Sequence, residues 1–154
     1  MATIVQAESD ADISRARELF EEYVRMVDAP ECFAGFEDEL AGLPGAYAAP
    51  AGRLYIALED GMATGCVALR GLDGYTAEMK RLYVRAGARG EGLGRRLAIK
   101  AIDAARKIGY ARLVLDTLPK MHEAALLYRS LGFRKIAPYL ACPTPGAICY
   151  ELRL

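Results

Sequence analysis

Residues 84–96 read Val-Arg-Ala-Gly-Ala-Arg-Gly-Glu-Gly-Leu-Gly-Arg-Arg, a stretch with four glycines and four arginines. Glycines allow the backbone to approach a ligand closely and to point several N–H groups at one spot. A helix predicted to begin in this stretch adds partial positive charge at its N-terminus, and Arg89, Arg95 and Arg96 add formal charge. This combination predicts a site for a phosphate or pyrophosphate, and a flexible connector is the alternative.

Two familiar phosphate-binding loops do not fit this stretch. A dinucleotide fingerprint needs G-x-G-x-x-G, but Gly90 and Gly92 are followed by Arg95 at the third position. A P-loop needs Lys directly after its last glycine, whereas Leu93 follows Gly92. The stretch also comes too late in the chain for the first strand-helix turn of a dinucleotide-binding domain.

Hydrophobic periodicity predicts the elements on both sides of this loop. A strand over 75–84 precedes it, and an amphipathic helix that starts at Leu93 and is closed by Gly109 follows it. Upstream we expect an edge strand at 4–7, a helix from Ser9 or Asp10 to Pro30, a shorter helix within 32–43, a loop over 43–52, and strands at 53–58 and 62–69. Downstream we expect a strand at 111–116, a helix over 124–131, and strands at 133–136 and 147–154. Hairpins with one strand-helix-strand crossover predict an α/β (α+β) fold with a mixed sheet flanked by helices.

The length and composition indicate one globular domain over residues 1–154. The chain is 53% hydrophobic and 26% charged, which excludes wholesale disorder, and it has no internal repeat. No run approaches the roughly 18 apolar residues of a membrane span, and the first residues lack a signal peptide. We therefore expect a cytoplasmic protein without membrane contact.

The cysteines do not indicate a metal or redox centre. Cys32, Cys66, Cys142 and Cys149 include no C-x-x-C pair, and the chain has one histidine. We expect free, mostly buried thiols and no metal.

The zero net charge hides an asymmetry between two parts of the chain. Residues 1–60 carry a net charge of −9, and residues 61–154 carry +9. The basic part suits an anionic ligand and the acidic part a cationic one. Alternatively, the two parts form solvated faces that attract each other in the fold.

Two segments together resemble a known family. Residues 89–94, Arg-Gly-Glu-Gly-Leu-Gly, fit the pattern R/Q-x-x-G-x-G/A and resemble the acetyl-CoA-binding motif of the GNAT N-acetyltransferase superfamily. Residues 124–133 look like its A-x-x-L-Y-x-x-x-G-F helix-to-strand signature. The order of the elements is similar too, so the resemblance covers nearly the whole chain and implies the GNAT fold, in which two splayed parallel strands form the CoA groove. Residues 115–119 and 143–146 look like a bacterial subgroup whose substrate the resemblance does not name.

The resemblance implies where acetyl-CoA would bind. Backbone groups of the strand before the loop, at Leu82, Tyr83 and Val84, would hold the pantetheine arm, and the N–H of Leu82 would face the thioester carbonyl and stabilise an oxyanion. The pyrophosphate would lie on the backbone N–H groups of Arg89, Gly90, Glu91, Gly92, Leu93, Gly94 and Arg95. Met121 and Ala124 would complete the cofactor site, with Met121 at a position where the family often has Asn.

The resemblance also implies catalytic residues. Tyr128 matches the usual general acid, which protonates the departing CoA thiolate, and a core aromatic is the alternative. Glu78 matches the position of a general base in some family members, acting directly or through water, and a strand glutamate paired with Lys80 or Arg81 is the alternative. His122 is a second possible base or substrate contact. Asp116 ends a strand on the side where ligands usually bind, or instead caps or pairs with Arg112.

These implications lead to an N-acyltransferase that moves the acetyl group of acetyl-CoA to a primary amine, on a small molecule, peptide or protein. We expect direct attack in a ternary complex, without an acyl-cysteine. The acceptor site would be lined by the N-terminal helices and the 43–52 loop, where Glu37, Asp38 and Glu39 favour a cationic amine.

Two other classes stay open. One is a CoA-binding regulatory domain that keeps the fold without the chemistry. The other is a nucleic-acid-binding module that uses the basic part, although that part lacks exposed aromatics beside its arginines, so we expect no nucleic-acid partner. The family includes dimers, which leaves a homodimer open.

Overall fold

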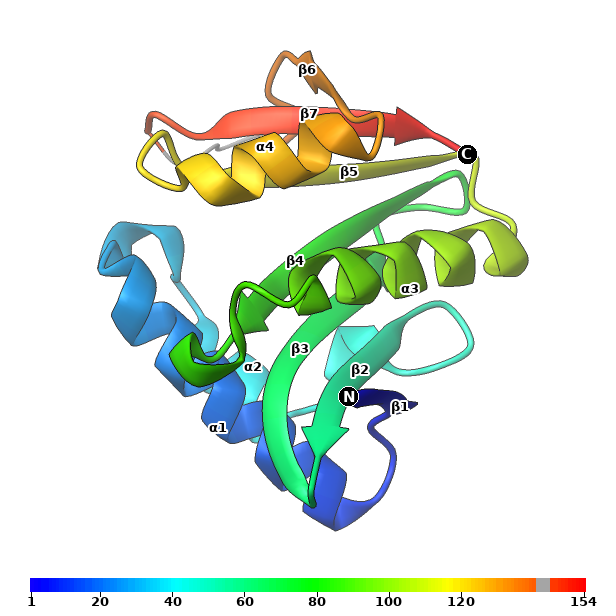
Figure 1. Ribbon diagram of the computed structural model, residues 1–154. Helices are drawn as coiled ribbons and strands as arrows, with labels where there is room; N and C mark the ends of the chain where they lie inside the picture. Colours follow the sequence, from blue (N-terminus) through cyan, green and yellow to red (C-terminus); the bar gives the residue numbers. More distant parts are fainter. Residues whose placement is uncertain (141–144) are drawn as a thin grey trace.

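The protein is built on one seven-stranded mixed sheet (Figure 1). The computed structural model describes residues 1–140 and 145–154. The strands are β1 (Thr3–Gln6), β2 (Arg53–Glu59), β3 (Met62–Gly71), β4 (Thr76–Val84), β5 (Arg112–Thr117), β6 (Arg134–Ile136) and β7 (Ile148–Arg153), in the order β1-β2-β3-β4-β5-β7-β6. Neighbouring strands are antiparallel except β4 and β5, which are parallel. The mixed sheet confirms the predicted fold class.

Helices cover both faces of the sheet. On one face lie α1 (Asp10–Val27) and α2 (Phe36–Ala41), and on the other lie α3 (Leu93–Ile108) and α4 (His122–Ser130). Short 3-10 turns occupy Pro30–Cys32, Gly45–Tyr47 and Ala86–Ala88. The β4-α3-β5 unit is the predicted crossover, and the glycine-rich loop joins β4 to the start of α3.

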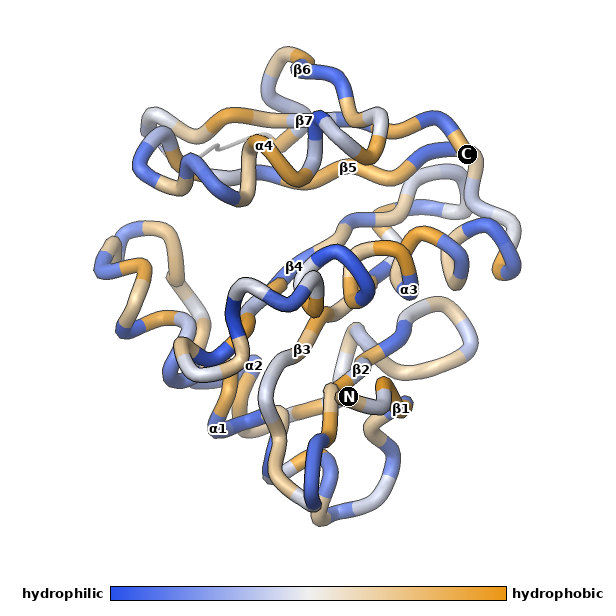
Figure 2. The backbone as a smooth tube through the Cα atoms, in the orientation of Figure 1, coloured by the Kyte–Doolittle hydropathy of each residue, from blue (hydrophilic) through white to orange (hydrophobic). Residues whose placement is uncertain are grey.

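Each helix layer closes its own apolar core. Leu19 and Phe20 of α1 pack on Leu54 and Ile56 of β2 on one face. On the other face, Leu97 of α3 belongs to a larger cluster with the inner sides of β2 to β5, β7 and α4. The hydropathy colouring alternates along α1 and α3, as expected for helices with one buried stripe (Figure 2).

Local capping explains where the long helices begin and end. The hydroxyl of Ser9 accepts a hydrogen bond from the Asp12 N–H at 3.1 Å, which satisfies one free donor of the first turn of α1. Gly109 ends α3 in the left-handed region at φ 110°, where glycine carries no Cβ penalty. Both signals confirm the predicted boundaries.

The sheet splays open between β4 and β5. Their pairing runs only from Thr76–Arg112 to Glu78–Val114, and both strands continue beyond it without pairing to each other. In Figure 1 the two ribbons diverge from this point. The register of β4 against β3 also shifts at this level, so β4 carries a bulge where the opening begins.

The structure differs from the predicted elements in two places. The predicted helix within 32–43 is divided, because Gly35 takes φ 78° and α2 starts only at Phe36. The final strand β7 lies between β5 and β6, an order that the sequence did not indicate.

The structure reports on three of the four cysteines. Cys66 and Cys149 are buried free thiols and Cys32 is a half-buried one, as predicted, whereas Cys142 lies outside the described residues. Across the helices that the structure describes, none combines the length and apolar character that a membrane crossing requires.

Candidate active site

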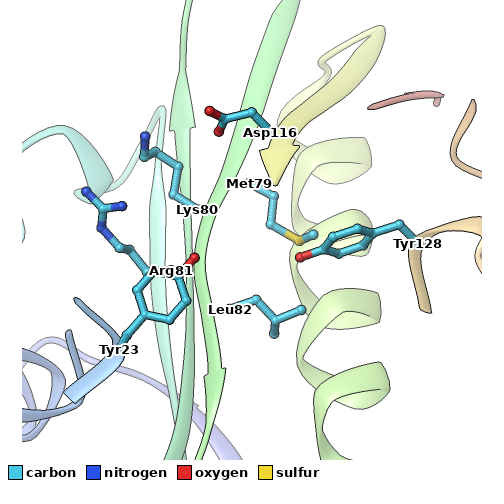
Figure 3. Close-up of a pocket in the computed structure, with 7 residues that line it drawn as sticks. All are labelled: Tyr23, Met79, Lys80, Arg81, Leu82, Asp116 and Tyr128. Atoms are coloured by element: carbon cyan, nitrogen blue, oxygen red, sulfur yellow. The ribbon is translucent and has the colours of Figure 1, made fainter. Parts of the chain in front are cut away.

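A small cavity of about 40 Å³ lies where β4 and β5 separate (Figure 3). Its walls come from α1, β4, β5 and α4, so it is reached by helices from both faces of the sheet. The lining residues are Tyr23, Met79, Lys80, Arg81, Leu82, Asp116 and Tyr128. Two of them, Leu82 and Tyr128, are predicted site residues.

Arg81 sets the bulge of β4. Its φ of 59° lies in the left-handed region, which costs a residue with a side chain about 1–3 kcal/mol. Its guanidinium donates to both carboxylate oxygens of Glu39, at 2.9 and 2.8 Å, and lies over the rings of Phe33 and Phe36. The thiol of Cys66 donates to the Arg81 carbonyl at 3.2 Å. These contacts between the α2 region and the sheet stabilise the strained conformation.

Glu78, the predicted base, is fully buried beside the cavity rather than on its wall. Arg70 Nε donates to Oε1 at 2.7 Å, and the Tyr139 hydroxyl donates to Oε2 at 2.5 Å. Lys80 Nζ lies 3.9 Å from Oε1. The ion pair foreseen as the alternative exists, but its main partner is Arg70, since Arg81 binds Glu39 instead.

Lys80 and Asp116 are the two charged groups of the cavity wall without a close partner. Among the described residues, Lys80 donates no hydrogen bond within standard distance, and Asp116 accepts none. Burial lowers the pKa of Lys80, and the charges of Glu78 and Asp116 oppose that shift in part. The suggested pairing of Asp116 with Arg112 is wrong, because Arg112 binds Glu151 at 2.8 Å on the neighbouring strand.

Tyr128 points its hydroxyl across the cavity toward Met79 and β4 (Figure 3). Its ring packs against Phe133 and Tyr150, with centroids 5.7 and 6.2 Å away. Burial raises the pKa of Tyr128, so the hydroxyl keeps its proton at neutral pH. Tyr23 lines the cavity from α1, and burial raises its pKa to about 12.

The glycine-rich loop presents a row of unused donors. In residues 1–140 and 145–154, no acceptor is found for the backbone N–H groups of residues 90–95. Gly90 and Gly92 have φ of 86° and 78°, and a Cβ at either would meet nothing within 4 Å. The row begins one residue later than predicted, because the Arg89 N–H donates to the Ala86 carbonyl at 3.3 Å.

The arginines of the loop have different surroundings. Arg89 Nε donates to the Val84 carbonyl at 2.9 Å, and Arg95 Nη1 donates to Ser130 at 2.8 Å, so both stay beside the row. Arg96 instead reaches the Ala2 carbonyl at 2.8 Å and faces the N-terminal strand. The positive charge near the loop therefore comes from Arg89 and Arg95.

The start of α4 holds the remaining predicted residues. Met121 is the N-cap and its sulfur accepts from the Thr117 hydroxyl at 3.5 Å, while Ala124 is half-buried against the core. His122 is exposed and does not line the cavity. In the part of the chain that the structure describes, no three His, Cys, Asp or Glu side chains are grouped to hold a metal ion.

A second, larger cavity of about 310 Å³ lies under α2 and the 43–52 loop. It is lined by Asp38, Glu39, Gly42, Pro44, Gly45, Ala46, Tyr47 and Arg70. Glu39 and Arg70 are also the partners of Arg81 and Glu78. Two ion pairs thus connect this cavity with the residues around the smaller one.

The model of the acetyltransferase (GNAT) family matches residues 13–133, well over half of the chain. The chain belongs to the GNAT acetyltransferase family. An uncharacterized N-acetyltransferase of Schizosaccharomyces pombe is 37% identical over 145 residues, covering 93% of this chain and 89% of the relative. An N-acetylaspartate synthetase of Danio rerio is 29% identical over 126 residues, covering 80% of this chain and 45% of that protein.

Solved GNAT structures share the architecture over their full length. An acetyltransferase from Streptococcus agalactiae has a TM-score of 0.84 at 24% identity, covering 99% of this chain and 98% of that one. A GNAT family acetyltransferase from Elizabethkingia anophelis with acetyl-CoA bound has a TM-score of 0.72 at 21% identity, covering 99% and 98%. The predicted fold is confirmed, and the family membership confirms the predicted N-acyltransferase class.

Proposed function

We propose that this GNAT protein transfers the acetyl group of acetyl-CoA to a primary amine, on a small molecule, peptide or protein, by direct attack within a ternary complex. The observation that carries the proposal is the row of unused N–H donors at residues 90–95, which adjoins the splayed end of β4. The donors suit the pyrophosphate of CoA, and the opening between the strands suits its extended arm.

The cofactor would extend from the glycine-rich loop, along the open end of β4, to the small cavity. The phosphates would lie on the backbone of residues 90–95, beside Arg89 and Arg95, and the pantetheine arm would run along Leu82, Tyr83 and Val84. The acetyl-CoA-bound relative supports this cofactor class. Met121 and Ala124, at the start of α4, would border the arm from the other side.

The reaction forms one C–N bond and breaks one C–S bond. The neutral amine attacks the thioester carbonyl, the N–H of Leu82 stabilises the oxyanion, and the CoA thiolate leaves. The Tyr128 hydroxyl donates to the departing sulfur. An ammonium substrate loses two protons in the process: one ends on the CoA thiol and the other goes to solvent.

The amine must lose its first proton to a base. Asp116 is the carboxylate on the cavity wall, so we propose that it faces the amine directly. Glu78 is fully buried off the cavity wall, with both carboxylate oxygens already bound, so its predicted role as base would need a water relay. The cavity under α2 would hold the rest of the acceptor, in line with the expected acceptor side.

The proposal includes a cytoplasmic location for the protein. The free thiols of Cys66 and Cys149 agree with a reducing compartment such as the cytoplasm. A homodimer stays a prediction. The name of the N-acetylaspartate synthetase relative supports a small amino compound as one class of acceptor.

The deciding experiment separates transfer from cofactor binding. Purified protein is incubated with acetyl-CoA and a panel of amines, amino acids, peptides and aminoglycosides, and free CoA thiol is measured. Calorimetry with acetyl-CoA runs in parallel. We expect binding and acceptor-dependent thiol release. Binding without thiol release from any acceptor would contradict the transferase and favour the CoA-binding regulatory domain.

A further inference from the structure

Three charged side chains line the cavity at the splay, and three more lie within ion-pair distance of one of them or of each other. The cations are Arg70, Lys80 and Arg81, and the anions are Glu39, Glu78 and Asp116. Two pairs are closed, since Arg81 holds Glu39 with two hydrogen bonds and Arg70 holds Glu78 with one at 2.7 Å. In each of these two pairs the positive and the negative charge compensate each other.

Lys80 and Asp116 are left over, and both line the cavity. In Figure 3 the charged ends of both side chains point toward the upper side of the view. They do not bind each other, because no N–O distance between them falls within 4.0 Å. The Lys80 side chain is only 19% exposed, and among the described residues the anion within 4.0 Å of its ammonium is Glu78, at 3.9 Å. A buried charge without a close partner is costly, and a ligand of opposite charge would compensate for it.

We propose that the acceptor is a free amino acid, whose carboxylate binds Lys80 and whose amino group lies at Asp116. This inference rests on the proposed function and specifies its substrate class. An amino acid carries an ammonium and a carboxylate on one carbon, which matches one anion and one cation on the wall of one small cavity. The charge-assisted hydrogen bonds to both groups would orient the nitrogen for attack.

Other amine classes fit these two charges less well. A simple alkylamine satisfies Asp116 and leaves Lys80 without a partner. A peptide N-terminus presents a neutral amide where the carboxylate would be. A polyamine brings a second cation toward Lys80, which like-charge repulsion disfavours.

The size of the cavity agrees with a polar head group. One water needs about 10–15 Å³ of such space, so roughly three waters would fill the cavity of about 40 Å³. That is comparable to the carboxylate and amino group of an amino acid. The side chain of the substrate would extend outside this small cavity.

The test compares each amino acid with its own carboxamide. The twenty common L-amino acids and their α-carboxamides are titrated by calorimetry into protein saturated with CoA. We expect at least one amino acid to bind ten times more tightly than its amide. Lys80→Met should bring this ratio close to one, whereas Lys135→Met, a matched loss of charge at an exposed site on β6, should leave it unchanged. Lys80→Gln repeats the measurement with a polar end if Lys80→Met lowers the melting temperature.

The second arm concerns the amino group. Asp116→Asn should reduce the preference for the amino acid over the corresponding 2-hydroxy acid. Equal binding of acid and amide by the wild type, no binding of any amino acid, or an unchanged ratio in the Lys80 variants would overturn the proposal. Because binding is read without turnover, amino-acid binding without thiol release contradicts only the transferase activity. Thiol release at the same rate with amino acids and with their carboxamides contradicts only the amino-acid site.

Discussion

At the scale of single residues, Tyr128 combines a packed ring with a hydroxyl that faces the cavity of the candidate site. Its ring fills the space between Phe133 and Tyr150, and its hydroxyl faces the cavity without a hydrogen bond to any described residue. Since burial raises the pKa of Tyr128, the phenol holds its proton firmly. It is therefore suited to donate toward a sulfur that becomes negative, and poorly suited to act as a base.

Tyr128→Phe tests this role directly. The variant keeps the ring and loses one oxygen, so the melting temperature and the affinity for CoA should change little. Thiol release should fall by about 10²-fold, as is typical for loss of a general acid, in kcat and in kcat/KM together. Steady-state kinetics beside thermal melts check both parts. Full turnover in Tyr128→Phe would make Tyr128 a packing residue.

The two carboxylates near the cavity should respond differently to neutralisation. Asp116 faces the cavity, so Asp116→Asn should lower kcat/KM most strongly at low pH, where the amine is hardest to deprotonate. Glu78→Gln removes a buried partner of Arg70 and should instead mainly reduce stability, by about 3–5 kcal/mol. The measurements are pH–rate profiles and urea unfolding. A changed pH profile only in Glu78→Gln would reverse the assignment.

At the scale of elements, the site depends on where regular structure stops. The loop before α3 leaves its donors free because Gly92 is an N-cap without a side chain. The pairing of β4 with β5 stops at Glu78, and a bulge follows at Arg81, whose guanidinium binds Glu39 of the α2 helix. A helix start and a strand irregularity thus create the two halves of the proposed cofactor groove.

A charge at Gly94 should block the phosphate half of that groove. A Cβ at Gly94 would meet only ordinary contacts, with Val84 at 3.8 Å and Leu127 at 3.9 Å, so small side chains fit. Gly94→Asp should lower the CoA affinity by more than tenfold, because its carboxylate opposes the pyrophosphate. Gly94→Asn is the control of equal size, and it should retain more affinity. Calorimetry with CoA compares them, and equal affinities in both variants would exclude a phosphate site here.

At the scale of the whole molecule, the acidic and basic parts of the chain meet in the fold. Glu22 of α1 binds Arg85 after β4, and Glu39 of α2 binds Arg81 within β4. The opposite charges of the two parts are therefore used in part as internal ion pairs, which supports the alternative foreseen in the sequence. Hydrogen bonds from Arg85 lower the pKa of Glu22, and burial opposes the shift in part.

The ion pair between Glu22 and Arg85 should make the stability of the protein depend on pH. A carboxyl with a lowered folded-state pKa stabilises the protein above its unfolded-state pKa, and that contribution disappears as the pH falls through the folded-state value. Glu22→Gln should therefore lower the melting temperature at pH 7, and this difference should shrink as the pH falls below the ordinary range of a glutamate toward pH 3. Thermal melts from pH 3 to 8 compare the two proteins. A constant difference across this range would contradict the ion-pair account.

Local signals in the sequence determined the elements and one half of the site. Turn glycines, caps and apolar periodicity act over a few residues, so the long helices, the strands and the glycine-rich loop could be predicted from the sequence, although the donor row begins at Gly90 and not at Arg89 and the helix expected within 32–43 begins only at Phe36. The family motifs added the position of Tyr128 and the groove beside Leu82. The sequence also indicated that the opposite charges of its two parts could meet.

Only the tertiary structure decided which distant residues meet. Arg81 and Glu39 are 42 positions apart, and no local pattern of the sequence predicts their contact or the left-handed conformation of Arg81. The sequence indicated Glu78 as a candidate base, but only the tertiary packing showed that Arg70 and Tyr139 already donate hydrogen bonds to its carboxylate. Lys80 and Asp116 share a cavity because β4 and β5 part after three residue pairs. Such arrangements arise from contacts between elements, so they follow from the fold and not from any single segment of the chain.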